Sequence, residues 1–543
     1  MSMFGFSIRC FVIACPLLVN GCSYPTQTLT GLPASFVGAT QEVIAPGLSY
    51  FNVQRGELSG YFELSSSVLS ASDAEVLVEK LNNYLSTLDH QSTADTLEAK
   101  QVDLVEQGPD GSDLGKLITL GQFNTLADAQ KMQQQLVASG FQLRPSHSSQ
   151  RSGGEGKQEI SILKLVPTAY SGSLTSNLAK QQISGVEKTS SIAARKQALA
   201  AVNGGFFAFN SSQGVIGDVA GLAVVDGTLV SEAVAGRPAL VINNQPALSV
   251  DIINNVHSQI SLSVADKVFH VDGINRLPGK IFNCGFSHPN VLAIHDFVCH
   301  KPNEIIVYNH YFGNLAGILS HNEFHFFVDE NNSVYFDLPN QSAVLPIGHR
   351  LVIATGESAT PLKKTVSSKA QVAIAEQIIS DSGVLTLNKG TYVINGGPTL
   401  LIDGKQPVSQ RSSQGWGVRA IQEGTAAIDE RDGISETSAL NQRVNFYQNW
   451  VLKRHPRTAV GVTDNGEVYV VVVYGRDPFK SIGASITEMA ELMLELGVEK
   501  AINLDGGGSS VMVVNGHITG RPSDSTGERA VAEALLFTAN KKV

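Results

Sequence analysis

The chain has 543 residues, enough for about three or four domains, or for fewer large ones with sizeable cores. Charged residues make up only 16% of the sequence and hydrophobic residues 43%, a balance that fits a compact, strand-rich protein and excludes a disordered one. The formal net charge of −10 argues against a general nucleic-acid binder, so an anionic ligand would require locally placed arginines.

The N-terminus has the features of an export signal. Arg9 is followed by the apolar segment Phe11–Val19, which is too short to span a bilayer as a mature helix. The small Gly21 before Cys22 resembles a bacterial lipoprotein cleavage site, in which Cys22 becomes the lipidated first residue. Residues 1–22 are therefore predicted to be a lipoprotein-type signal peptide, with an ordinary secretory signal as the alternative. We expect an exported protein that is lipid-anchored to a bacterial membrane and faces the periplasm or the cell surface.

The next part of the chain predicts a tether and a small domain. Residues 23–50 are rich in Thr, Pro, Ser and Gly, which is typical of a tether. Residues 51–147 contain two similar units, each with a strand, a turn and a helix that is capped by Ser70 or Thr125. This pattern predicts a small α/β domain, and the polar residues 148–157 predict a linker after it.

The second of these units carries a further pattern. Gly121-Gln122-Phe123, Asp128-Ala129 and Leu136–Phe141 together resemble a SPOR domain, a small α/β module that binds peptidoglycan glycan strands. The resemblance implies peptidoglycan as a partner. A generic ferredoxin-like α/β domain without this function explains the same residues equally well.

Residues 158–543 are predicted to form one large α+β domain with mixed sheets. Asp226-Gly227, between short apolar runs, predicts a hairpin, and Val468–Tyr474 predicts a strand that is buried on both faces. Ser485 and Glu488 have the spacing of a capping box at the start of an amphipathic helix. We expect these packed elements to position the glycine-rich loop that follows them.

Two cysteines lie inside this large domain. Cys284 and Cys299 form an even pair in an exported protein, which predicts a disulfide between them. The neighbouring His288, His295 and His300 leave a zinc site as an alternative, although the spacings match no standard structural pattern. Two free thiols are the third possibility.

Residues 408–450 have many polar side chains and no clear period, with Trp416 and Trp450 near the two ends. A connection of this length inside a compact domain is either disordered or functional. We therefore consider the hypothesis that this segment is a lid over a substrate site.

Three strand ends share one construction. Each apolar strand runs into Asn or Asp and then glycines, at Asn203-Gly204, Asn395-Gly396 and Asp505–Gly508. Residues without a Cβ let the backbone approach a ligand closely, and Asn and Asp are common in such turns. One loop of this kind is ordinary turn chemistry, whereas three predict a shared polar site.

The motifs around these loops occur in a fixed order and together resemble the phosphodiester glycosidase family over roughly residues 155–541. They are Asn203-Gly204-Gly205-Phe206-Phe207, Gly236-Arg237-Pro238, Asn395-Gly396-Gly397-Pro398, Arg454-His455-Pro456-Arg457-Thr458, Asn503–Ser510, Arg521–Asp524 and Gly527–Arg529. The resemblance implies hydrolysis of a sugar-1-phosphodiester at its glycosidic bond.

Arginine suits the phosphate of such a substrate because its guanidinium is planar and always charged. Arg457 lies in the densest motif and is the first candidate, followed by Arg237, Arg521 and Arg529. A structural ion pair or a solvated surface charge is the alternative for each of them.

A carboxylate must act as the nucleophile or as the base that activates water. Asp505 is the leading candidate and Glu528 the second. Asp505 could instead hold a divalent cation or stabilise its loop, and Glu528 could be the ion-pair partner of the adjacent Arg529.

The remaining candidates would bind the substrate through amide, hydroxyl and backbone groups. They are Asn203, Gly204, Asn395, Gly396, Thr458, Asn503, Gly506, Gly507, Gly508 and Ser509. His455 is left out of this set because Pro456 implies a rigid turn in which a structural histidine is more common.

We therefore expect a hydrolase that removes an α-linked sugar, N-acetylglucosamine or a related hexose, from a sugar-1-phosphodiester in the bacterial cell envelope. One alternative is a non-catalytic lipoprotein that binds glycan or peptidoglycan. Another is a phosphodiesterase that cleaves the other P–O bond. Nucleic acid is not an expected partner.

Overall fold

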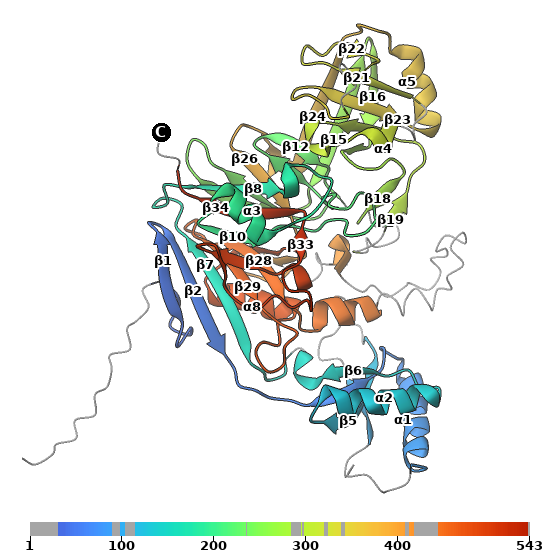
Figure 1. Cartoon of the computed structure of the whole chain (residues 1–543), viewed down its shortest axis with the longest axis vertical. Coiled ribbons are helices and arrows are strands. Elements are labelled where there is room, and N and C mark those ends of the chain that lie inside the picture. The colour runs from blue at the N-terminus through green and yellow to red at the C-terminus, as the bar shows by residue number, and fades with distance from the viewer. Residues whose placement is uncertain are drawn as a thin grey trace, which may run out of the picture.

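The structure is a computed structural model, and it places three lobes along the long axis of the molecule (Figure 1). It describes residues 31–88, 98–103, 114–151, 153–234, 236–283, 295, 298–319, 324–337, 343–407, 412–416 and 444–540. The predicted signal peptide, including Cys22, lies outside the described residues. In the described part of the chain, no helix combines the length and the apolar character needed to cross a membrane.

The small lobe at the bottom of Figure 1 is a four-stranded sheet with two helices. Its elements are β3 (Phe62–Ser65), α1 (Ala71–Leu85), β4 (Ala99–Asp103), β5 (Lys116–Phe123), α2 (Leu126–Ala138) and β6 (Arg144–His147). The strand order is β4-β5-β3-β6, with antiparallel neighbours. The side chains of Ser70 and Thr125 cap the two helices as predicted.

The segment before this lobe corrects the predicted tether. Residues 40–50 are not a tether, because β1 (Thr40–Ala45) and β2 (Leu48–Arg55) form a hairpin that belongs to the large domain. β2 pairs along its whole length with β7 (Gln158–Leu165). Leu48 and Phe51 of β2 are buried in this pairing. Their apolar pattern is too short to indicate a strand within a segment of polar composition. The small domain therefore starts after residue 55 and not at residue 51.

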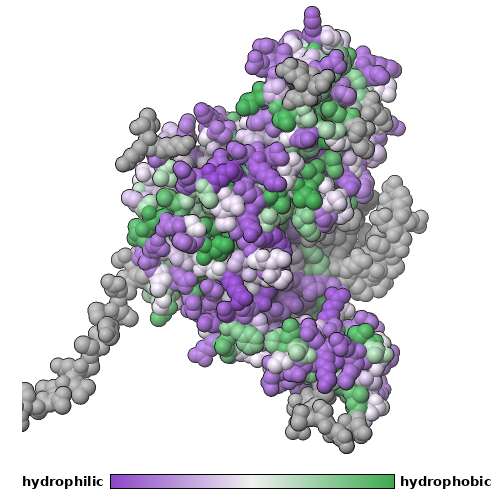
Figure 2. Space-filling view, viewed as in Figure 1, coloured by the Kyte–Doolittle hydropathy of each residue, from purple (hydrophilic) through white to green (hydrophobic). Residues whose placement is uncertain are grey.

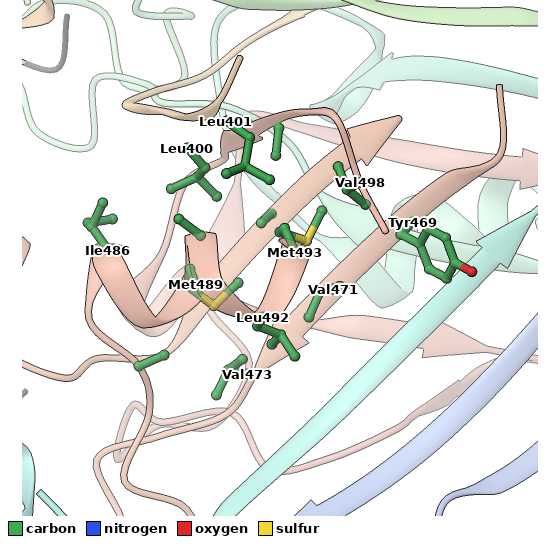
Figure 3. Close-up of a cluster of buried hydrophobic side chains, with 14 of the residues drawn as sticks. Leu400, Leu401, Tyr469, Val471, Val473, Ile486, Met489, Leu492, Met493 and Val498 are labelled. Atoms are coloured by element: carbon green, nitrogen blue, oxygen red, sulfur yellow. The ribbon is translucent and has the colours of Figure 1, made fainter. Parts of the chain in front are cut away.

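A seven-stranded sheet with the order β1-β2-β7-β29-β28-β30-β27 forms the base of the large domain. Its other strands are β27 (Thr399–Leu401), β28 (Arg457–Val462), β29 (Val468–Val473) and β30 (Lys500–Asn503). The predicted strand β29 is buried along its whole length. Helix α8 (Ile486–Glu495) starts with the predicted capping box of Ser485 and Glu488. Its apolar face packs on the sheet, and Met489, Leu492 and Met493 face Val471 and Val473 (Figure 3).

Two five-stranded sheets cover this base. The first has the order β32-β31-β10-β34-β8 and the second β12-β11-β26-β13-β14. Their strands are β8 (Ser173–Leu178), β10 (Ala200–Asn203), β11 (Ala223–Val225), β12 (Thr228–Ser231), β13 (Ala239–Asn243), β14 (Ser249–Ile253), β26 (Thr391–Asn395), β31 (Met512–Val514), β32 (His517–Ile518) and β34 (Glu533–Thr538). Helix α3 (Thr189–Lys196) and the short pair β9 (Glu187–Lys188) and β33 (Ala530–Val531) accompany the first sheet.

One apolar core joins the three sheets of the large domain. Leu163, Val202, Ile394 and Val470 all belong to it and come from β7, β10, β26 and β29. The predicted hairpin at Asp226-Gly227 is confirmed between β11 and β12, and both residues have positive φ. Because these strands share a core, the loops at their ends are held in fixed relative positions.

The third lobe, at the top of Figure 1, is inserted between β14 and β26. One apolar cluster lies within it, around Ile306 and Phe327, and a second one joins it to β11, β13 and β26. Its sheets have the orders β16-β15-β24-β25 and β17-β20-β23-β21-β22. Its elements are β15 (His257–Val264), β16 (Lys267–Val271), β17 (Gly273–Ile274), β20 (Ile305–Tyr308), α4 (Ala316–Leu319), β21 (Phe324–Val328), β22 (Val334–Tyr335), β23 (Arg350–Ala354), α5 (Ala359–Thr365), β24 (Val372–Ser380) and β25 (Gly383–Leu385). The predicted single domain therefore carries a separate lobe.

The hairpin of β18 (Lys280–Phe282) and β19 (Val298–His300) follows β17 along the chain and contains one of the two cysteines of the large domain. Cys299 is disulfide-bonded, and a disulfide sulfur is not available as a thiolate ligand for zinc. Cys284 and His288 lie outside the described residues, so the pairing of Cys284 with Cys299 stays a prediction.

Candidate functional site

The first and third glycine loops meet at the ends of β10 and β30. Thr458 Oγ1 donates to Asn203 Oδ1 at 2.8 Å, and Asn203 Nδ2 donates to the main-chain oxygen of Asp505 at 2.7 Å. The Asp505 N–H donates in turn to the Gly204 oxygen at 3.2 Å. Asn203 is fully buried, so its amide joins β28, β30 and its own loop from the inside.

The second glycine loop connects to both of the others. Asn395 Oδ1 accepts from the Phe206 N–H at 2.9 Å, and the Gly397 N–H donates to the Asn503 oxygen at 2.7 Å. A Cβ added to Gly205 would lie 2.3 Å from the main-chain oxygen of Asn395, so only glycine fits there. The three loops, far apart in the sequence, thus form one connected group.

The predicted amide and hydroxyl ligands lie inside this group. The side chains of Asn203, Asn395, Asn503 and Thr458 are buried and bond to loop backbone or to one another. They hold the loops in position, and direct contact with a substrate stays a prediction for them. The N–H groups of Gly506, Gly507 and Ser509 also donate within or next to their own loop, so these expected donors stabilise the loop.

Two of the predicted arginines are also buried. Arg457 is 2% exposed, donates to the main-chain oxygens of Ala484 and Trp450, and stacks 4.7 Å from the Trp450 ring centroid. Arg237 donates to the Gln414 oxygen and stacks 4.6 Å from the Trp416 ring centroid. Burial, assisted by the charge of Arg476, lowers the pKa of Arg457 to about 9, and the guanidinium remains charged at neutral pH.

The ends of the segment 408–450 meet over the first glycine loop. The rings of Trp416 and Trp450 lie 5.8 Å apart, and both contact Phe206. His295 packs among these three rings, and burial followed by the charge of Arg237 lowers its pKa well below 6.5. Residues 417–443, and with them most of the hypothetical lid, lie outside the described residues.

The accessible part of the site lies around Asp505 and the glycines that follow it. Asp505 is half-buried, and its Oδ1 accepts from the Gly506 N–H at 2.8 Å. A Cβ on Gly507 would lie 3.0 Å from Nη2 of Arg476, and a Cβ on Gly508 would lie 2.3 Å from Nη2 of Arg529. Both carboxylate oxygens of Asp524 also lie 2.3 Å from the position of a Cβ on Gly508, so the glycines let Asp524 and two exposed guanidinium groups pack against the loop that follows Asp505.

Arg476 is a site residue that the sequence reasoning missed. It follows the buried strand β29, has a φ of +66°, and lies 3.6 Å from the Asp524 carboxylate. Burial and the charge of Arg529 lower its pKa, while Asp524 opposes this change. Arg476 comes after a strand that lies close to the strand leading to Asp505. This position was the sequence signal that could have identified it. A charged residue after a long apolar run is otherwise an ordinary strand end.

The remaining charged candidates have partners that differ from the expected ones. Glu528 is not the partner of Arg529, because its carboxylate accepts from the Ser190 N–H at 2.8 Å and from the Ser190 hydroxyl at the start of α3. Arg529 binds Asp524 at 2.7 Å instead. Arg521, which is exposed, forms an ion pair of 3.5 Å with Asp477. Glu528 thus has a helix-capping position, and a catalytic role for it stays a prediction.

His455 is held in one tautomer. Its Nε2 lies 2.6 Å from the Asn449 oxygen, an acceptor, so this nitrogen carries the proton. Burial first, and then the charges of Arg457 and Arg476, lower its pKa to about 3. The imidazole is therefore neutral at physiological pH, and its exclusion from the catalytic candidates stays a prediction.

Glu533 is a second residue that the sequence did not indicate. It is 1% exposed, and its carboxyl accepts from the Gly205 N–H at 3.3 Å and from Ser176 Oγ at 2.7 Å. Burial raises the pKa of this carboxyl to about 7, against the effect of both hydrogen bonds. A titratable group thus lies directly beneath the first glycine loop.

This arrangement places the half-buried Asp505 carboxylate on the same rigid loop against which Arg476, Arg529 and their partner Asp524 pack. Guanidinium groups bind phosphate oxygens, and a carboxylate can attack an anomeric carbon or activate water. Among the residues that the structure describes, no group of three or more His, Cys, Asp or Glu side chains is arranged to hold a metal ion. The arrangement suits hydrolysis of an anionic ester.

Comparisons with known proteins find similarity over part of the chain. Residues 325–538 match the model of the phosphodiester glycosidase family. The N-acetylglucosamine-1-phosphodiester alpha-N-acetylglucosaminidases of Bos taurus and Homo sapiens are 38% identical over 104 residues and 36% identical over 95 residues. These alignments cover 19% and 18% of this chain, but only 18% and 17% of the two relatives.

A solved structure from Burkholderia pseudomallei, described as an exported protein, is similar over much more of the chain. It has 26% sequence identity and a TM-score of 0.76, and the likeness covers 92% of this chain and 96% of that one. The Asn203 loop lies outside the residues that match the family, whereas Asn395, Arg457 and Asp505 lie inside them. Residues 325–538 of the chain are therefore similar to the phosphodiester glycosidase family, and the chain spans less than a fifth of the length of these two relatives.

Proposed function

We propose that this protein hydrolyses the glycosidic bond of a sugar-1-phosphodiester and releases an α-linked sugar, N-acetylglucosamine or a related hexose. The observation that carries the proposal is the position of Asp505 at the start of the glycine loop against which Arg476 and Arg529 pack, within residues similar to this family. The names of the bovine and human relatives supply the sugar. A phosphate monoester is a good leaving group, so little acid assistance is required.

The proposed step gives each exposed group one role. Arg476 and Arg529 bind the phosphate oxygens of the substrate, and Asp505 attacks the anomeric carbon or removes a proton from the attacking water. The C1–O bond breaks, its electron pair goes to the phosphate, and water supplies the hydroxyl of the free sugar. Arg457 and Arg237, which are buried, support the loops through the two tryptophans.

We also propose that the protein works in a bacterial cell envelope. The apolar segment and Cys22 at the N-terminus support export with a lipid anchor, and the solved relative from Burkholderia pseudomallei is described as exported. Incorporation of labelled palmitate into the wild type but not into Cys22→Ala is the expected result. Labelling of both proteins would contradict Cys22 as the anchor.

The small domain supports a further proposal of peptidoglycan binding. Its strand-helix-strand-strand-helix-strand order is the one that ferredoxin-like and SPOR modules share. Sedimentation of the full chain with purified sacculi tests the proposal, with the protein in the pellet as the expected result. Protein that stays in the supernatant would leave a purely structural role for this domain.

The test of the main proposal uses the full chain, because a protein that starts at residue 155 would lack β1 and β2 and expose β7. UDP-N-acetylglucosamine is the model substrate, and NMR identifies the products. Free sugar plus UDP is the expected result for the wild type and for the matched surface control Asp464→Asn, with a loss of at least about 100-fold in Asp505→Asn.

The other products decide between the alternatives. Sugar-1-phosphate plus UMP would mean that the protein is a phosphodiesterase for the other bond. No turnover across a panel of sugar phosphodiesters would favour a glycan-binding lipoprotein without catalysis. Equal activity of Asp505→Asn and the wild type would remove Asp505 from the mechanism.

A further inference from the structure

The buried carboxyl group of Glu533 has no role in the reaction proposed above. Charged side chains usually lie at the surface of a protein, and hydrophilic residues predominate on the molecular face shown in Figure 2. Glu533 departs from this rule, because it is 1% exposed at the start of β34, which lies between β10 and β8 in its sheet (Figure 1). Burying a carboxyl group costs free energy, so its position requires a reason that an apolar side chain would not.

Glu533 binds two successive amides of the first glycine loop. The Gly204 N–H donates to the main-chain oxygen of Glu533 at 2.9 Å, and the Gly205 N–H donates to its side-chain Oε1 at 3.3 Å. A Cβ on Gly204 would lie 2.4 Å from Cγ of Glu533, and a Cβ on Gly205 would lie 2.3 Å from the main-chain oxygen of Asn395. The two glycines are therefore packed closely against Glu533 and the second glycine loop.

The same loop holds the backbone of Asp505. The Asp505 N–H donates to the Gly204 oxygen at 3.2 Å, and the Asp505 oxygen accepts from Asn203 Nδ2 at 2.7 Å. Both the amide and the carbonyl of Asp505 thus have partners in residues 203 and 204. A shift of this loop would displace the carboxylate of Asp505, and a displacement of about 1 Å can lower a rate about 100-fold.

The second hydrogen bond of the Glu533 carboxyl group connects it to β8. Ser176 Oγ donates to Oε2 at 2.7 Å, and Ser176 is fully buried. Burial raises the pKa of Glu533 to about 7 against the effect of both hydrogen bonds, so the carboxyl group is mostly neutral in the folded protein at about pH 6. A neutral carboxyl group still offers its carbonyl oxygen to the Gly205 N–H, and the amide of a glutamine can do the same.

We infer that Glu533 is a positioning residue for the proposed reaction, which holds the backbone of Asp505 through the loop Asn203–Gly205. The inference rests on the proposed function for the role of Asp505. Glu533 lies beneath the loop and does not touch the substrate. Loss of its acceptor should lower kcat more than it changes KM, because Arg476 and Arg529, which bind the phosphate in the proposed step, come from other segments of the chain.

Three substitutions of Glu533 in the full chain separate the acceptor from the length of the side chain. Glu533→Gln keeps an oxygen acceptor at the same distance, Glu533→Met keeps the length without a strong acceptor, and Glu533→Asn shortens the side chain by one methylene group. With UDP-N-acetylglucosamine at about pH 6, kcat should stay within about 3-fold of the wild type in Glu533→Gln. It should fall at least about 10-fold in Glu533→Met and Glu533→Asn, with KM within about 3-fold.

The matched control is Ser176→Ala, which removes the other hydrogen bond of the carboxyl group and leaves the bond to Gly205. It should keep kcat within about 3-fold of the wild type. Urea unfolding of each variant establishes that the protein is folded under the conditions of the assay.

Hydrogen exchange measured by mass spectrometry tests the same coupling without turnover. In Glu533→Met, the peptides that contain Gly205 and Asp505 should exchange at least about 10-fold faster than in the wild type, whereas β29 (Val468–Val473) should be unchanged. In Glu533→Gln, all three should exchange as in the wild type.

The outcomes separate this inference from the proposed reaction. If the wild type turns over no sugar phosphodiester but this exchange pattern is found, the proposed reaction fails and the role of Glu533 in holding the Asp505 backbone stands. Wild-type kcat in Glu533→Met and Glu533→Asn, an equal loss of kcat in Glu533→Gln, or unchanged exchange at Asp505 in Glu533→Met would overturn the inference.

Discussion

Replacing Glu533 by Gln should stabilise the large domain at about pH 8 but not at about pH 4.5. Glu533 is 1% exposed at the start of β34, where its carboxyl accepts hydrogen bonds from the Gly205 N–H and the Ser176 hydroxyl. Gln has the same shape, can keep one acceptor for Gly205, and presents an amide N–H to the Ser176 oxygen. The substitution therefore changes mainly the ability of the site to ionise.

The expected pH dependence follows from the direction of the pKa shift. Burial raises the pKa of Glu533 from 4.5 to about 7. Below 4.5 the carboxyl is protonated in both the folded and the unfolded chain, and the stability it contributes is fully present. Between pH 4.5 and about pH 7 the carboxyl ionises in the unfolded chain but not in the folded chain, so the stability that it contributes is lost. At about 1.4 kcal/mol per pKa unit, the loss is about 3 kcal/mol.

Urea unfolding followed by tryptophan fluorescence measures this effect. The chain has 2 tryptophans, Trp416 and Trp450. Both contact the first glycine loop, which lies directly above Glu533 in the large domain. The free energy of unfolding of Glu533→Gln relative to the wild type should rise by about 3 kcal/mol between about pH 4.5 and about pH 8. Glu491→Gln, an exposed substitution on α8, should show no such rise. The same difference at both pH values for Glu533→Gln would refute the assigned pKa.

Three further predictions concern the elements around the site. Ser485→Ala removes the capping box of α8 and should lower the free energy of unfolding by about 1 kcal/mol in the same urea assay. Gly397→Ala would place a Cβ 2.3 Å from the Trp416 ring and should lower the free energy of unfolding by at least about 2 kcal/mol. The control Gly466→Ala, with no atom within 4 Å of its Cβ, should lower it by about 1 kcal/mol. Equal losses in the two variants would contradict the packing argument. Because burial lowers its pKa to about 3, His455→Gln should leave the shape of the pH–activity profile unchanged between about pH 4 and about pH 9. A profile that lost one ionisation would contradict the neutral imidazole.

Elements with local signals could be predicted from the sequence. The capping box at Ser485, the hairpin at Asp226-Gly227 and the buried strand β29 depend on residues within a few positions of one another. The loops at Asn203 and Asp505 follow the same logic, because a strand that ends in a polar residue and glycines needs no distant partner to be visible. These patterns predicted the loops of the site and their order along the chain.

The tertiary structure alone decided which groups these loops present. The amide of Asn203 turns inward to Thr458 and Asp505, Glu528 binds Ser190, and Arg476 reaches the glycine loop from β29. Each of these contacts joins residues that are far apart in the sequence, and a charged side chain selects its partner by distance in space. Composition likewise concealed the pairing of β2 with β7 and the inserted lobe with its apolar cluster around Ile306 and Phe327. Local physics therefore determined the elements, whereas long-range packing decided which side chains are buried and which remain accessible to a substrate.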